Sequence, residues 1–74
     1  MSIGRLALLD GSTVVCDYRF EVSDRGFLRL PEAMFVAHGE QIHGAILDLA
    51  DGGELRVDVV MGPRVGEASF SVRV

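Results

Sequence analysis

The clearest strand pattern in the chain is Thr13-Val14-Val15-Cys16-Asp17-Tyr18-Arg19-Phe20-Glu21-Val22, which leads into Ser23-Asp24-Arg25-Gly26. Apolar side chains occupy every second position of the run: Val14, Cys16, Tyr18, Phe20 and Val22. Successive side chains of a β-strand point to opposite faces, so this alternation predicts a half-buried antiparallel strand, with Val15 as an apolar exception on the polar face. Ser, Asp and Gly favour turns, and Gly accepts positive φ, so we expect the chain to reverse over residues 23–26.

Shorter apolar segments on both sides of this run predict further strands. They cover residues 3–9, 27–30, 41–50, 54–61 and 68–74. Asp10-Gly11-Ser12 and Asp51-Gly52-Gly53 separate neighbouring segments and are typical of tight hairpins. The apolar phase slips around Gly44, which predicts a β-bulge there.

Together these segments indicate an all-β fold in a single small domain, residues 1–74. Short strands with a turn roughly every eight to twelve residues favour a six-stranded antiparallel barrel or sandwich. Residues 32–37 follow Pro31 and have weak helical character, so we expect at most one short helical turn there. A domain of this size buries only about 60% of its unfolded surface, so the core is small.

Composition and charge argue against several classes of protein. The net charge is −4, whereas proteins that bind nucleic acid polymers carry a basic footprint. Cys16 is the only cysteine, which argues against a disulfide framework and favours a reducing cytoplasm. With His38 and His43 it offers too few zinc ligands at suitable spacing, so we expect no metal or other cofactor. No signal-peptide pattern and no apolar run of about 20 residues is present, so we do not expect membrane insertion.

No group of residues in the sequence predicts catalysis. The serines lack the Gly-x-Ser-x-Gly context of a nucleophile elbow, and Cys16 lies mid-strand on the apolar face. The loop Gly62-Pro63-Arg64-Val65-Gly66 lacks the Gly-Lys-Ser/Thr ending of a phosphate-binding loop. Asp48 and Asp51 bracket a turn, as turn residues do. We therefore expect a protein that is not an enzyme.

The turn after the long strand resembles a motif of the PilZ domain family. That motif is Asp/Asn-x-Ser-x-x-Gly at the end of an early strand; here Glu21 takes the acidic place, and Ser23 and Gly26 match. The downstream order is also similar, with a short apolar strand, Gly39-Glu40 before the next strand, and a closing strand at residues 70–74. The resemblance covers most of the chain in pattern and implies a PilZ-like barrel from a bacterial signalling protein of the cytoplasm.

In that family the turn acts with an upstream Arg-x-x-x-Arg to bind cyclic di-GMP. The resemblance therefore implies a ligand site made of Arg5, Glu21, Ser23, Arg25 and Gly26. Arginine stacks on guanine or forks onto its O6/N7 edge, a carboxylate and a hydroxyl satisfy the remaining groups, and glycine permits close approach. The chain departs from the family pattern because only Arg5 precedes the turn, and Glu21 is one methylene longer than Asp.

A second register of the same motif exists. Arg25 and Arg29 have Arg-x-x-x-Arg spacing, and Asp48-Leu49-Ala50-Asp51-Gly52-Gly53 follows with Ala50 in the serine position. Too few residues follow Gly53 to form the remaining strands, so we prefer the first register. A plain hairpin turn over residues 21–26 is the alternative to any ligand-binding role.

The sequence thus predicts a non-enzymatic interaction module, similar to a degenerate PilZ domain, that docks on a protein partner or associates with itself. The supporting feature is a set of apolar residues that fall off the core face of their strands: Val15, Phe27 and Val60. Exposed apolar patches often mark interfaces. The alternative is a cyclic di-GMP receptor that uses the turn and nearby arginines.

Overall fold

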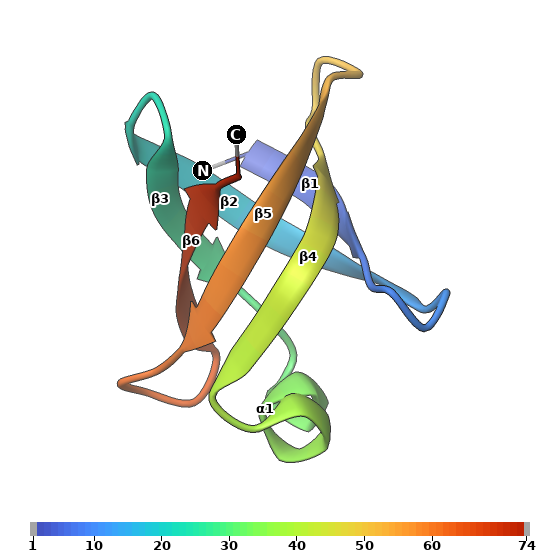
Figure 1. The fold of residues 1–74 in the computed structure, drawn as a ribbon. Coiled ribbons are helices and arrows are strands. Elements are labelled where there is room, and N and C mark those ends of the chain that lie inside the picture. The colour runs from blue at the N-terminus through green and yellow to red at the C-terminus, as the bar shows by residue number, and fades with distance from the viewer. Residues whose placement is uncertain (1, 74) are drawn as a thin grey trace.

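The computed structural model describes residues 2–73, apart from the side chains of residues 37 and 38. Within these residues the chain forms six strands and one short helix (Figure 1). In chain order they are β1 (Ser2–Ala7), β2 (Thr13–Val22), β3 (Arg25–Arg29), α1 (Glu32–His38), β4 (Gln41–Asp48), β5 (Glu54–Met61) and β6 (Glu67–Val72).

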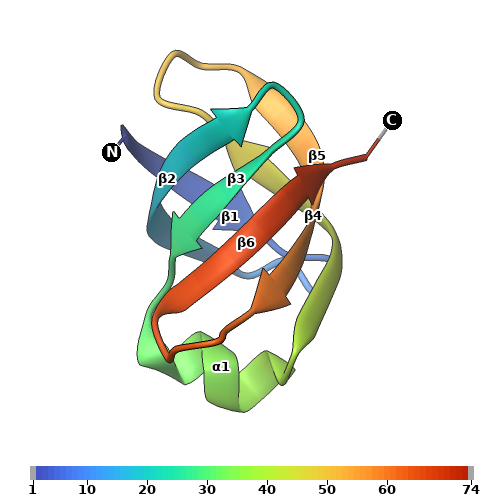
Figure 2. The same cartoon turned by 90° about the vertical axis from the view of Figure 1, so that its left-hand side faces the viewer.

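The strands close into a barrel in which every neighbouring pair is antiparallel. Their order around the barrel is β1-β2-β3-β6-β5-β4, and β4 returns to β1. Figure 2 shows β6 lying beside β3, although they are far apart along the chain. The predicted all-β class is confirmed, and of the two predicted arrangements the barrel is the one that forms.

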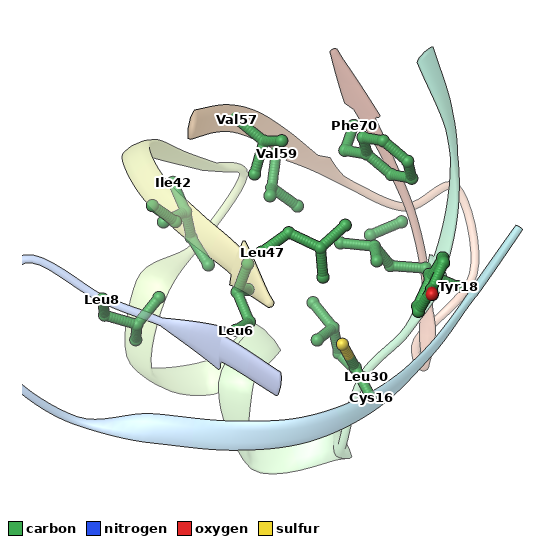
Figure 3. Packing of buried hydrophobic residues seen from close by; sticks show 13 residues of the cluster. Leu6, Leu8, Cys16, Tyr18, Leu30, Ile42, Leu47, Val57, Val59 and Phe70 are labelled. Carbon is green, nitrogen blue, oxygen red and sulfur yellow. The ribbon is translucent and has the colours of Figure 1, made fainter. Parts of the chain in front are cut away.

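The core fills the barrel with apolar side chains from all six strands, as Figure 3 shows for its buried members. Leu6, Leu28, Leu47, Val57 and Val59 are the largest side chains that are fully buried. Cys16 and Tyr18 of β2 point inward as the alternation predicted, and Val15 is 58% exposed on the outside. The Tyr18 hydroxyl accepts a hydrogen bond of 2.8 Å from the backbone N–H of Ala50, which satisfies the polar end of this buried ring.

The last residues of β2 do not follow the predicted alternation. The ladder to β3 pairs Phe20 with Gly26 and then Val22 with Arg25, so Glu21 is an extra residue in a β-bulge. Residues opposite one another on antiparallel strands share a face, and the inserted residue turns Val22 to the outer face with Arg25. The prediction that Val22 faces the core is therefore wrong, and its side chain is 45% exposed.

Gly26 also differs from its predicted role. It lies inside β3, between β2 and β6, rather than in the turn, and its φ is not positive. A Cβ at this position would overlap the carbonyl oxygen of Arg19 and lie 2.8 Å from Cα of Phe20. Glycine is needed here because the neighbouring backbone comes so close, and the turn itself consists of Ser23 and Asp24.

The predicted bulge near Gly44 is present, because the β4–β5 register shifts between Ile42 and Ala45. Gly44 has a φ of 70°, and its N–H donates a 3.0 Å hydrogen bond to Oδ1 of Asp58 on β5. Asp58 thereby satisfies a backbone donor that the bulge removes from the strand ladder.

Helix α1 covers one end of the barrel (Figures 1 and 2). It begins after Pro31 and ends before Gly39, whose N–H donates a hydrogen bond to the carbonyl oxygen of Phe35. Met34 and Phe35 are partly buried against the core. The helix has seven residues, about two turns, where the sequence predicted a single turn, because packing on the barrel stabilises a segment of weak propensity.

Candidate functional site

The outer face of β3 presents a short row of charged and aromatic side chains. Arg25, Phe27 and Arg29 alternate with the buried Gly26 and Leu28, as the pleat of a strand requires. The phenyl ring of Phe27 remains 38% exposed, although β3 is paired on both sides. An aromatic ring between two guanidinium groups is thus available on the barrel surface.

Neighbouring strands extend this row across the barrel wall. Arg19 of β2 and Ser69 of β6 lie opposite Phe27, and Val60 of β5 lies opposite Ser69. The Arg19 guanidinium carbon lies 5.5 Å from the centre of the Phe27 ring, a cation–π distance. We call this surface the Phe27 face; its members are Arg19, Arg25, Phe27, Arg29, Val60 and Ser69.

Two open hollows lie on this face, and Phe27 and Ser69 line both. The first has a volume of about 460 Å³, and its other lining residues include Arg19, Arg29, Pro63, Glu67 and Ala68. The second, of about 270 Å³, is lined by Glu21, Arg25, Gly26, Asp58, Val60, Phe70 and Ser71, among others. Ser69 lies between Phe27 and Val60 and has a small side chain. The side chain of Val60 is 48% exposed.

The arginines of the Phe27 face carry no carboxylate partner among the described residues. Asp58 forms an ion pair with Arg73 at 3.4 Å, and its Oδ1 lies 3.7 Å from Nδ1 of His43. Arg29 has Asp17 and Glu67 as its partners across the strand ladders, yet neither carboxylate lies within 4.0 Å of it. The guanidinium groups therefore keep their hydrogen-bond donors available to a ligand.

The structure brings together some of the residues expected at the ligand site. Glu21, Arg25 and Gly26 line the second hollow. Ser23 lies in the turn and is not part of its lining. Arg5 is opposite Val15 on β2, six residues before Glu21, which corresponds to roughly 20 Å along a strand. The expected five-residue site is therefore divided, and Arg5 lines a different hollow with Ile3, Val15 and Asp48.

The second motif register is not assembled either. The segment from Asp48 to Gly53 ends β4 and forms the hairpin to β5, and β4 pairs with β1 and β5. Arg25 and Arg29 lie on β3, whose neighbours are β2 and β6. The two halves of this register therefore lie on strands that do not adjoin.

Of the three apolar residues expected off the core face, two meet on one surface. Phe27 and Val60 lie on either side of Ser69, whereas Val15 lies beside Arg5 on the β1–β2 wall. Alternation on β2 and β3 already pointed Arg19 and Arg29 outward. Their position beside Ser69 depends on the pairing of β3 with β6, which could not be predicted from the sequence.

In the described part of the chain, His43 and Asp58 bring an imidazole and a carboxylate together, with Nδ1 3.7 Å from Oδ1. No set of three or more His, Cys, Asp or Glu side chains there could hold a metal ion. Burial and then the neighbouring Asp17 carboxylate raise the pKa of the Cys16 thiol from 9.0 to about 11. The thiol is therefore protonated near neutral pH, where the thiolate would be the nucleophile.

Comparison with protein-family models, with curated proteins and with solved structures returned no match. Among the described residues, no helix has the length and apolar character needed to span a membrane.

Proposed function

We propose that the chain is a non-enzymatic interaction module that docks on a protein partner through the Phe27 face. The observation that supports this most is the exposed pair Phe27 and Val60, which flank the small Ser69 on three adjoining strands. The centre of a protein interface is enriched in aromatic residues and arginine, and this face combines both. The hollow beside Phe27 offers room for a side chain of the partner.

The test is quantitative affinity capture with the wild-type chain and two matched variants. Phe27→Ser removes the central ring, and Val15→Ser removes an exposed apolar side chain from another wall of the barrel. We expect a partner that wild type and Val15→Ser capture equally and that Phe27→Ser loses. Equal thermal unfolding of both variants would show that the barrel is intact. A partner that all three chains retain, or that none captures, would contradict the proposal.

A second candidate function is reception of cyclic di-GMP, favoured by the meeting of Glu21, Arg25 and Gly26 at one hollow. Arg25 would stack on guanine or bind phosphate, and Phe27 beside it adds an aromatic surface. A PilZ-like identity, with a role in cytoplasmic bacterial signalling, is part of both proposals: a degenerate PilZ-like domain in the docking module and a ligand-binding one in this candidate. The cyclic di-GMP candidate lacks support from Arg5 and Ser23, because neither residue lines the second hollow.

Calorimetric titration with cyclic di-GMP tests this second candidate. We expect binding that weakens about tenfold in Arg25→Gln, because a charge-assisted contact is lost, and that is unchanged in Arg56→Gln, which lies on β5 outside either hollow. No heat at protein concentrations of tens of micromolar would exclude micromolar affinity and remove this candidate.

A further inference from the structure

The first hollow is lined by apolar side chains together with two arginines and one acid, Glu67. Phe27, Pro63 and Ala68 line it with apolar surface, and Arg19 and Arg29 contribute guanidinium groups from adjacent strands. Arg19 lies directly across the ladder from Phe27, and Arg29 lies two residues along β3. A ligand with its apolar part against Phe27 thus has two cations within reach of its flanks.

Arg19 and Arg29 differ from Arg73 in having no carboxylate partner among the described residues. Arg73 already holds a carboxylate oxygen of Asp58 at 3.4 Å. Neither Arg19 nor Arg29 forms an ion pair within residues 2–73, and Glu67, which also lines the hollow, does not approach Arg29 within 4.0 Å. Guanidinium groups bind carboxylates through two parallel hydrogen bonds, and these two groups retain that capacity.

The barrel also limits how a partner can bind here. β3 is hydrogen-bonded to β2 on one side and to β6 on the other, so no strand edge is free on this face to accept an added strand. Recognition must therefore use side chains rather than backbone pairing. A hollow of about 460 Å³ is large enough for one or two side chains of a protein segment.

We propose that the occupant of the Phe27 face is an acidic segment of a protein partner, an inference that rests on the docking function proposed above. One aliphatic or aromatic side chain of the segment enters the first hollow against Phe27 and Pro63. Carboxylates on neighbouring residues of the segment bind Arg19 and Arg29. An acidic segment can bind here although the net charge of the chain is −4, because the two arginines act locally. Exposed charges more than about 8 Å away are largely screened at physiological salt.

The experiment selects peptides from a phage-displayed random dodecapeptide library on the full wild-type chain, with a parallel selection on Phe27→Ser. We expect enriched peptides in which Asp or Glu adjoins an aliphatic or aromatic residue. Synthetic copies, followed by fluorescence anisotropy, should lose binding to Phe27→Ser and weaken about tenfold with Arg19→Gln plus Arg29→Gln. Arg56→Gln is the matched control and should bind like wild type, and added salt should weaken wild-type binding.

Other outcomes overturn this inference in distinguishable ways. Enriched peptides without acidic residues, or binding that survives the double arginine variant, would exclude an acidic partner and leave docking at Phe27 intact. A Phe27-dependent dimer in light scattering would assign the face to a second copy of the chain. A selection with no Phe27-dependent peptide would exclude a linear segment, and the capture experiment would then decide the docking function separately.

Discussion

Gly26 shows how a single residue can be predicted as important for the wrong reason. Its place after Ser23 and Asp24 suggested a turn glycine with positive φ. It lies instead within β3, buried where the backbone of β2 at Arg19 and Phe20 leaves no space for a Cβ. The sequence around Gly26 does not predict this contact, because the contact depends on the register between β2 and β3.

Replacing Gly26 with Ala should lower the free energy of unfolding by about 1–3 kcal/mol, as overpacking typically does. The added methyl would overlap the Arg19 carbonyl oxygen, so the strands must separate locally. Chemical denaturation of both proteins measures the difference.

Gly53→Ala is the control, because its φ is also not positive and its Cβ would meet mainly the end of the Asp51 side chain, at 3.1 Å. We expect that variant to stay within about 0.5 kcal/mol of wild type. A Gly26→Ala protein as stable as Gly53→Ala would contradict the close strand contact.

Cys16 should make the stability of the barrel fall at high pH. Its pKa is raised from 9.0 to about 11 by burial, so between these values the unfolded chain loses the thiol proton while the folded chain keeps it. The free energy of unfolding therefore decreases as pH rises through this window, by about 3 kcal/mol in total, and is unaffected by the thiol well below pH 9.

Unfolding of wild type and Cys16→Ala at roughly pH 8, 9.5 and 11, which lie below, within and at the upper end of this window, separates this effect from other titrations. We expect the stability of wild type to fall more steeply with pH than that of the variant. Parallel curves would mean that the thiol ionises as easily in the folded chain as in the unfolded chain.

At the scale of elements, two bulges determine which side chains face outward. The bulge at Gly44 follows from the sequence, because an apolar phase slip containing a glycine requires an extra residue. The bulge at Glu21 interrupts a regular alternation and could not be predicted from it. It immediately precedes a two-residue turn, Ser23-Asp24, in which neither φ is positive, unlike the turn types that match the strand twist.

Asp58 should stabilise the Gly44 bulge through its side-chain oxygen. Asp58→Ala leaves the Gly44 N–H without its 3.0 Å partner and removes the Arg73 contact, so we expect a loss of about 1–2 kcal/mol in the free energy of unfolding. Asp58→Asn keeps an acceptor oxygen and should recover most of that loss. Equal losses in the two variants would show that charge, rather than the hydrogen bond to Gly44, is what matters.

At the scale of the whole molecule, the β1–β4 contact is the place where the barrel closes. Within the described residues β1 and β4 share three register pairs, Arg5–Asp48, Leu6–Leu47 and Ala7–Ile46. The β4–β5 and β1–β2 ladders each have six. Closure nevertheless buries Leu6 and Leu47 completely, so the short ladder is backed by the core.

Hydrogen exchange should detect the β1–β4 contact as the first place where the barrel opens. We expect the amides that bond between β1 and β4 to exchange sooner than those between β4 and β5, because fewer hydrogen bonds must break together. Residue-resolved exchange by NMR or mass spectrometry measures this order. If the β1–β4 amides exchange last, packing of Leu6 and Leu47 outweighs the short ladder.

Alternation and turn residues in the sequence were sufficient to determine the all-β class and the main strands, and they placed Cys16 and Tyr18 in the core. These are local properties, because the pleat of a strand and the φ preferences of Gly, Asp and Ser act over a few residues. The tertiary structure alone decided that the sheet closes and that Arg19, Phe27, Ser69 and Val60 form one surface. That surface depends on the pairing of β3 with β6, which joins distant parts of the chain, and strand register of this kind is set by packing rather than by neighbouring residues.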